Sequence, residues 1–259
     1  MIKILKAEFF RLKNFKTYFI LLGIVAFLPL LSFLMTKGSL ILVSSEFVNW
    51  DGCAMMFIST TATFGSTTDL IALICTAVFL CREFGDGPIR NAILSNKSRT
   101  TIYFSYFIVA LFIGVSYCLA EYVMQVLCFS TFGFGELSFN KVFVGCVETF
   151  TLSFFLTIFS QCTVVMFLFC TRKMATTIIF PILVAQLAPA YISSFFGLLA
   201  NIGAIKGNAQ RWLPFFNLQL FDASNPNAIL VLQVLLYIVP VSALFVYLGW
   251  NSFRKADLK

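Results

Sequence analysis

The sequence contains no histidine, and charged residues make up only 11% of its 259 positions. Without imidazole the chain cannot form Ser-His or Cys-His nucleophile pairs, or the paired-histidine motif of zinc proteases. None of its eight cysteines forms a Cys-x-x-Cys pair, and seven lie in or beside apolar stretches, where cysteine acts as a small apolar residue. These absences argue against an enzyme and against a resident metal ion.

Sequence signals for nucleotide binding are missing as well. No G-x-x-x-x-G-K-[ST] phosphate loop occurs, and no polar segment is long enough to fold into a nucleotide-binding domain. If ATP drives this protein, ATP and its magnesium ion must be bound by a separate subunit. The chain itself is therefore expected to hold no cofactor.

Apolar residues, by contrast, are abundant. They make up 60% of the chain, and the mean hydropathy is +0.94, which predicts an all-α integral membrane protein with one transmembrane domain over residues 1–259. A helix needs about 20 apolar residues to cross the hydrocarbon core. Six segments qualify, while five or seven remain possible because Asp69 interrupts the second segment and the third is longer than one crossing requires. The predicted spans are 17–36, 62–81, 101–124, 146–170, 174–200 and 229–250.

The distribution of basic residues predicts the orientation. With the amino terminus in the cytoplasm, fourteen of the eighteen Lys and Arg residues fall in cytoplasmic segments, as the positive-inside rule requires. An odd number of spans would break this alternation, so six spans with both termini cytoplasmic are expected. The bilayer then accounts for the net charge of +7, and no nucleic-acid partner is needed. The fourteen are Lys3, Lys6, Arg11, Lys13, Lys16, Arg82, Arg90, Lys97, Arg99, Arg172, Lys173, Arg254, Lys255 and Lys259.

Two segments outside the spans are amphipathic. In residues 1–16, apolar side chains recur at helical spacing from Ile2 to Leu12 with lysines on the other faces, which predicts a helix lying on the inner leaflet. A plain basic flank of the first span is the alternative. Residues 201–228 include the sequence Trp-Leu-Pro-Phe-Phe and predict an outer re-entrant or interfacial segment. Pro181 and Pro189 should kink the fifth span.

The polar segment at residues 83–99 carries the most specific pattern. Gly87 and Pro88 can start a helix, and Ile89, Ile93 and Leu94 then share one apolar face. Such a helix would lie along the membrane. The alternative is an ordinary amphipathic loop between two spans.

This segment resembles the first cytoplasmic loop of ABC-2-type exporter permeases, where it forms the coupling helix that docks onto the ATPase. The resemblance extends to the six spans, the charge pattern and the amphipathic amino-terminal helix. It differs at Asp86 and Pro88, since the family commonly has a threonine before the isoleucine. The residues that carry the ATPase-coupling role by this resemblance are Glu83, Phe84, Gly85, Gly87, Ile89, Arg90, Ile93 and Arg99.

The resemblance implies an ABC-2 (type V exporter-like) fold in the plasma membrane of a bacterium. Two copies of an ABC ATPase subunit and a second permease, identical or homologous, would complete the transporter, with the first two spans and the fifth near the seam between permeases. Bacitracin-resistance, lantibiotic-immunity and amphipathic-peptide exporters are similar compact permeases. The expected function is therefore export of a hydrophobic or amphipathic cargo, such as an antimicrobial peptide.

Three acids inside predicted spans, Asp69, Glu121 and Glu148, are the candidates for a cargo pathway, together with Pro181 and Pro189. A carboxylate at a helix centre costs about 2.5 to 3.5 kcal/mol on insertion scales, so these acids should face protein or water. They could form an acidic outer vestibule for a cationic cargo, or lie hydrogen-bonded at the outer interface. Two other functions stay open, namely a proton-coupled secondary transporter and a non-transporting membrane anchor for an ATPase.

Overall fold

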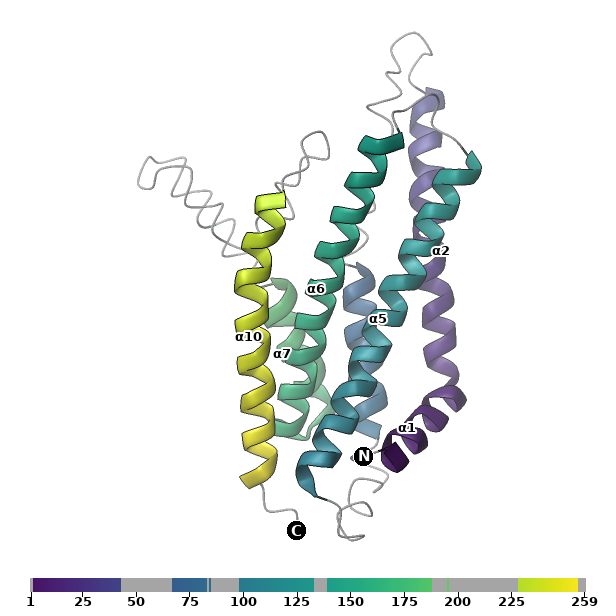
Figure 1. Cartoon of the computed structure of the whole chain (residues 1–259). Helices are drawn as coiled ribbons and strands as arrows, with labels where there is room; N and C mark the ends of the chain where they lie inside the picture. Colours follow the sequence, from purple (N-terminus) through teal and green to yellow (C-terminus); the bar gives the residue numbers. More distant parts are fainter. Residues whose placement is uncertain are drawn as a thin grey trace.

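The computed structural model describes residues 2–42, 67–82, 84, 98–132, 139–187, 195 and 228–255. All regular structure in these residues is helical, which confirms the all-α prediction for this part of the chain. The long helices lie side by side in one elongated bundle (Figure 1). The helices are α1 (Ile2–Asn14), α2 (Lys16–Leu42), an unlabelled helix at 67–82, α5 (Arg99–Phe132), α6 (Phe139–Thr171), α7 (Met174–Ile182), the π-helix η1 (Leu183–Leu187) and α10 (Ala228–Lys255).

Each of the six predicted spans overlaps one of these helices. By length and hydropathy, two described stretches can each cross a membrane, Arg99–Cys128 and Ser153–Thr171. A third is added if the bent pair Ile4–Asn14 and Lys16–Leu31 counts as one span. Six crossings therefore remain a prediction, and the predicted outer segment before α10 lies outside the described residues.

Helix α1 turns sharply away from α2. The two helix axes differ by 67°, and α1 projects across the end of the bundle (Figure 1). Leu12 is buried, while Leu5 and Phe9 pack against the same core. Lys6 and Lys13 are exposed. The amphipathic pattern in the sequence therefore forms a helix that covers the bundle with its apolar face.

The 67–82 helix lies at the centre of the bundle. Its side chains contact α5 through Cys75, to which the Tyr117 hydroxyl donates a hydrogen bond of 3.2 Å. They contact α6 and α7 through Leu73, which clusters with Val164 and Ile178. Only its first and last residues, of those described, are exposed. This helix has almost no lipid-facing surface, which explains why it tolerates more polar residues than a lipid-facing span would.

A group of aromatic rings packs at the end of the bundle where α1 begins and α10 ends. Phe169 of α6 lies at its centre, with ring-centroid distances of 5.3 Å to Phe84, 4.8 Å to Tyr103 and 4.7 Å to Phe253. Tyr106 is slightly farther away at 6.4 Å. The rings meet edge-on or tilted, the arrangements that aromatic quadrupoles favour. They join the end of the 67–82 helix to α5, α6 and α10.

Helices α6 and α7 form a tight hairpin. Arg172 has a φ of 56°, a left-handed conformation that reverses the chain after α6. The Thr177 hydroxyl donates a 2.9 Å hydrogen bond to the Lys173 carbonyl in the first turn of α7. Pro181 is buried inside α7, and the helix continues as the π-helix η1. The fifth predicted span is therefore irregular at Pro181, whereas Pro189 lies outside the described residues.

Helix α10 packs chiefly along α6, with a second contact on α5. The Tyr103 hydroxyl donates a 2.9 Å hydrogen bond to the Val246 carbonyl. Gly249 makes the close approach possible, because a Cβ there would lie 2.8 Å from the Tyr103 hydroxyl oxygen and 3.0 Å from the Cα atom of Met166. Small residues at helix contacts are the usual means by which membrane helices approach one another.

We expect Gly249→Ala to lower the stability of the folded permease by about 1–3 kcal/mol, since the backbone of α6 cannot move aside for the added methyl group. Thermal unfolding of the purified chain in nanodiscs measures the change. Gly23→Ala is the matched control, because a Cβ at Gly23 meets nothing within 4 Å. Equal unfolding temperatures for the two variants would show that α10 does not need the close contact.

Candidate functional site

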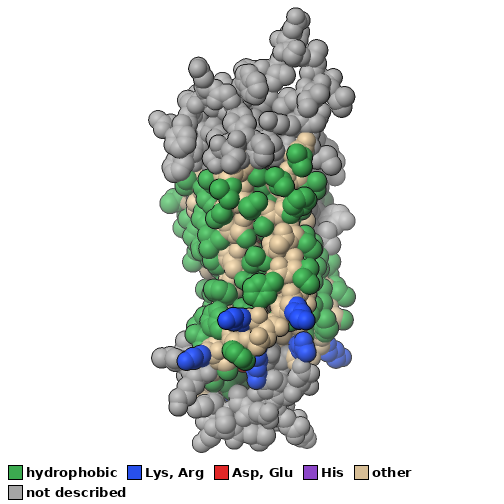
Figure 2. Space-filling view, turned by 90° about the vertical axis from the view of Figure 1, so that its right-hand side faces the viewer, with side chains coloured by type: hydrophobic (Ala, Val, Ile, Leu, Met, Phe, Trp, Pro, Cys, Tyr) green, Lys and Arg blue, Asp and Glu red, His purple; other side chains and the backbone are tan. Residues whose placement is uncertain are grey.

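Basic side chains gather at one end of the bundle. On the face seen in Figure 2, the visible Lys and Arg side chains lie below an apolar belt that covers its middle. The Lys and Arg side chains that the structure describes belong to α1, the start of α2, the end of the 67–82 helix, the start of α5, the α6–α7 turn and the end of α10. Segments that are far apart in the sequence therefore present one basic surface, suited to anionic headgroups or to an acidic partner.

The predicted coupling segment starts and ends at this basic end. Its described members are Phe84, Ser98 and Arg99, whereas Glu83, Gly85, Gly87, Ile89, Arg90 and Ile93 lie outside the described residues. The ring of Phe84 packs on Phe169 in the core. At the other flank, Arg99 donates a 3.0 Å hydrogen bond to the Arg254 carbonyl in the last turn of α10. Both flanks of the segment are thus fixed to the bundle.

Two of the residues assigned to ATPase coupling therefore make contacts inside this chain. Phe84 faces the core, so its ring is engaged within the permease. The Arg99 guanidinium satisfies a carbonyl at the end of α10, where a positive charge is favourable for the helix dipole. Thr100 beside it accepts a 3.4 Å hydrogen bond from the Trp250 indole. The part of Phe84 and Arg99 in ATPase binding remains a prediction.

Glu8 is a buried acid that the sequence analysis did not single out. Its side chain is 3% exposed, and its Oε1 atom forms a 3.0 Å ion pair with Arg11 on the same helix. The Tyr106 hydroxyl donates a 3.2 Å hydrogen bond to the same oxygen. Tyr106 belongs to α5 and is buried in the core of the bundle, so its hydrogen bond to Glu8 holds α1 against the bundle. The sequence signal was its spacing, since Glu8 falls on the helix face of Leu5 and Leu12.

Two of the three intramembrane acids lie inside the bundle. Asp69 is 6% exposed and Glu121 is 7% exposed. The Ser160 hydroxyl of α6 donates a 2.5 Å hydrogen bond to Asp69 Oδ2, and Glu121 lies within electrostatic reach of Asp69 and of Thr68. Glu148 belongs to α6, but its side chain is not described. The structure thus brings Asp69 and Glu121 together, and the cargo-pathway role of all three remains a prediction.

Further polar side chains are buried on α5 and α6. Thr157 and Gln161 of α6 are buried, as is Gln125 of α5. Gln161 lies against Gly114 of α5, since a Cβ added at Gly114 would lie 2.7 Å from the Cγ atom of Gln161. The sequence analysis missed these residues, because single hydroxyl and amide groups are common in membrane helices and only acids were counted. The buried polar residues of the 67–82 helix, α5 and α6 include Thr68, Asp69, Glu121, Gln125, Thr157, Ser160 and Gln161.

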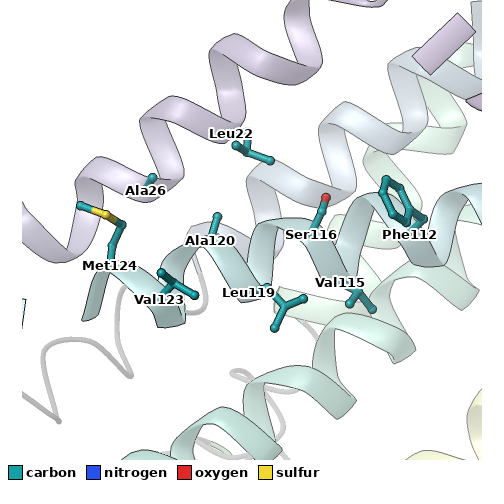
Figure 3. A pocket seen from close by; sticks show the side chains of 9 residues that line it. All are labelled: Leu22, Ala26, Phe112, Val115, Ser116, Leu119, Ala120, Val123 and Met124. Atoms are coloured by element: carbon teal, nitrogen blue, oxygen red, sulfur yellow. The ribbon is translucent and has the colours of Figure 1, made fainter. Parts of the chain in front are cut away.

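An open apolar groove runs between α2 and α5. Its volume is about 520 Å³, and Figure 3 shows Leu22 and Ala26 of α2 facing side chains of α5 across it. Among the described residues that line it, only Ser116 carries a hydroxyl, and that group already accepts a 2.8 Å hydrogen bond from Tyr18. The groove suits an acyl chain or another apolar helix and offers no anchor to a charged cargo.

The protein-family profile described as ABC-2 family transporter protein matches residues 4–188, from α1 to the end of η1. A search of curated proteins found no match to the chain.

The Glu8–Tyr106 contact can be measured by a double-mutant cycle. We expect Tyr106→Phe to destabilise the permease by about 1.5–3 kcal/mol, because it removes a hydrogen bond to a buried carboxylate. When Tyr106→Phe is combined with Glu8→Gln, the loss of stability should differ from the sum of the two single effects by a coupling energy of about 0.5–3 kcal/mol. Unfolding of nanodisc-embedded protein gives the four free energies needed, those of the wild type, the two single variants and the double variant.

Tyr247→Phe serves as the control for loss of a tyrosine hydroxyl, since Tyr247 is 58% exposed on α10. It should leave stability nearly unchanged. Strictly additive effects of the Glu8 and Tyr106 changes would mean that the contact does not fasten α1 to α5.

Proposed function

The chain belongs to the ABC-2 family of transporter proteins, and on that premise we propose that it exports a hydrophobic or amphipathic cargo, such as an antimicrobial peptide. It is the membrane-embedded permease of an ABC transporter and not a catalytic subunit, because ATP is hydrolysed by a separate ATPase in this family. The match confirms the family resemblance, and the roles of the coupling segment and the amino-terminal helix remain predictions.

The observation that best supports coupling to an ATPase is the placement of residues 84 and 99. Phe84 and Tyr103 both pack on Phe169, and Arg99 contacts the end of α10. The intervening segment therefore leaves and re-enters the bundle at its basic end. A segment held at both flanks can transmit a push from a docked ATPase to the 67–82 helix and α5 together.

The apolar exterior supports a cargo taken from the membrane. Lipid-facing side chains such as Phe19 and Leu236 cover the described helices, and the α2–α5 groove is lined almost entirely by apolar groups. A hydrophobic or amphipathic peptide can reach such a surface from the bilayer. The acids Asp69, Glu121 and Glu148 would meet the basic groups of that peptide once the helices separate, near the irregular segment around Pro181.

The proposed assembly contains two permeases and two ATPase subunits in a bacterial plasma membrane. We place the basic end in the cytoplasm, with six crossings and both termini on that side. The positive-inside rule supports this orientation, since the described basic side chains share one end of the bundle.

The docking role of the coupling segment is tested at Ile89. We expect Ile89→Asp to abolish binding of the ATPase that copurifies with the wild-type permease, because the charge falls on the apolar face predicted to enter the partner. Membrane insertion should be unchanged, since Ile89 lies between spans. Pull-down from membranes measures binding, and ATP-dependent peptide efflux measures coupling.

Asn91→Asp is the matched control, because it adds the same charge on the opposite side of the predicted helix. It should bind the ATPase normally. Phe84 is unsuitable for this test, since its partly buried ring packs against the core of the permease. Wild-type ATPase binding by the Ile89 variant would refute docking through this face.

The permease pair is tested by cross-linking from α7. Ile179 and Phe180 are 53% and 44% exposed, so α7 presents an apolar face that the second permease would cover. In a cysteine-free background, Ile179→Cys should give a disulfide-linked permease dimer in membranes. Tyr247→Cys on the exposed face of α10 is the control and should stay monomeric. A monomeric permease that still transports when reconstituted with its ATPase would refute this arrangement.

A further inference from the structure

The α2–α5 groove starts at the level of α1. The ring of Phe112, a groove residue on α5, packs edge-on against Phe9 of α1, with 4.9 Å between the ring centroids. Ser116 in the groove accepts its hydrogen bond from Tyr18, which lies two residues after the start of α2. From Phe112 to Met124 the groove follows twelve residues of α5, or about 18 Å at 1.5 Å per residue. It therefore runs from the α1–α2 bend along the bundle, away from the basic end.

The shape of the groove suits a slender, flexible chain. Its partly buried lining includes the small side chains of Ala26, Ser116 and Ala120, and Figure 3 shows the last two pointing from α5 toward α2. Phe112 and Leu119 are exposed and therefore form its edges. Membrane helices approach one another through small residues, but these large edges would keep a helix, about 10 Å across, off the small residues between them. An acyl chain is thin enough to reach them.

Exposed lysines flank the α1–α2 bend at which the groove starts. Lys13 of α1 and Lys16 of α2 are both exposed, and Lys16 lies six residues from Leu22 of the groove, about 9 Å along α2. The single acid of α1 and α2, Glu8, is buried and forms an ion pair with Arg11. Figure 2 views the side of the bundle on which α1 and α2 lie, and no acidic side chain of the described residues is visible there. The bend therefore favours an anionic group.

Charge and length together select one kind of occupant. The lysines attract an amphiphile with an anionic head and repel a cationic peptide. The groove length of about 18 Å is close to that of one leaflet, half of a hydrocarbon core of about 30 Å. The amphipathic pattern of α1 predicts that this helix lies at the level of the inner-leaflet headgroups. An anionic phospholipid of that leaflet meets all three conditions.

We propose that one anionic phospholipid of the inner leaflet binds here, with an acyl chain in the α2–α5 groove and its phosphate beside Lys13 and Lys16. The lipid contacts α1, α2 and α5 together, so it holds α1 in the docked position that the hydrogen bond between Tyr106 and Glu8 also stabilises. The site goes beyond the export of cargo and does not depend on it, since lipid binding is measured on the permease alone.

Quenching of a fluorophore by brominated lipids tests this site on the full-length permease in nanodiscs. In a cysteine-free background, Leu119→Cys carries the fluorophore at the edge of the groove. The nanodiscs contain phosphatidylglycerol and phosphatidylcholine in varied ratio, with bromine on the acyl chains of one lipid or the other. Each lysine near an anionic headgroup contributes about a fivefold preference, so phosphatidylglycerol should be preferred about 25-fold at this position. Leu236→Cys, on the exposed face of α10, is the control and should show no preference.

Lysine variants separate this site from general attraction to the basic end. Lys13→Gln combined with Lys16→Gln should lower the preference at residue 119 to nearly one. Lys173→Gln is the matched control, because Lys173 is an exposed lysine of the α6–α7 turn, and it should keep the full preference. Both lysines of the double variant lie on the surface, so the fold should be retained, and the unfolding temperature in phosphatidylcholine checks this.

A bulky side chain tests the groove itself. Ala120→Phe should fill it and reduce quenching by phosphatidylglycerol to the level seen with phosphatidylcholine. Ala243→Phe adds the same volume at an exposed position of α10 and should leave the preference unchanged.

Four results would overturn the proposal. Two are equal quenching of residue 119 by both lipids in the permease that keeps its lysines, and a preference that survives loss of Lys13 and Lys16. The third is weak quenching by either lipid together with a disulfide between two unlabelled Leu119→Cys chains, which would mean that a second permease covers the groove. The fourth is release of phosphatidylglycerol by an added cationic peptide, which would assign the groove to cargo. Peptide efflux is measured separately, so its absence with an intact lipid preference would count against the export proposal alone.

Discussion

Phe169 packs against rings from three other parts of the chain, and the arrangement of the basic end depends on these contacts. Phe84, Tyr103 and Phe253 lie within 5.3 Å of it, measured between ring centroids. Lipid is as apolar as these rings, so burial from water gives no net drive inside a membrane, and close van der Waals and quadrupole contacts must hold the helices together. Because the rings come from segments up to 169 residues apart, they fix where the coupling segment leaves and re-enters the bundle.

The same lack of water explains the polar contacts. In hydrocarbon, a hydroxyl or carboxylate must find its partner within the protein. The hydroxyl of Tyr103 donates a hydrogen bond to a carbonyl of α10, that of Tyr106 donates to Glu8, and that of Ser160 donates to Asp69. Each bond joins two helices, so the polar groups that would be costly in lipid specify which helices pack together.

These two kinds of contact separate the chain into regions with different tasks. Aromatic packing and the Arg99 contact with α10 fix residues 84 and 99 to the basic end of the bundle. The buried polar residues Asp69, Glu121 and Ser160 come from the 67–82 helix, α5 and α6. Asp69 and the basic residue Arg82 lie thirteen positions apart on the 67–82 helix.

Composition and periodicity by themselves determined the helical class, the approximate places of the helices and the amphipathic face of α1, because each depends on neighbouring residues. The family followed from the resemblance of residues 83–99 to a known cytoplasmic loop. The sequence also showed that Asp69 and Glu121 should avoid lipid. It could not show that Phe84 points into the core, that Arg99 binds the end of α10 or that Glu8 is buried against Tyr106. Those contacts join distant residues, since Arg99 lies 155 positions from Arg254 and Glu8 lies 98 positions from Tyr106. Only tertiary packing decides them, because side chains that distant meet only after whole helices have docked.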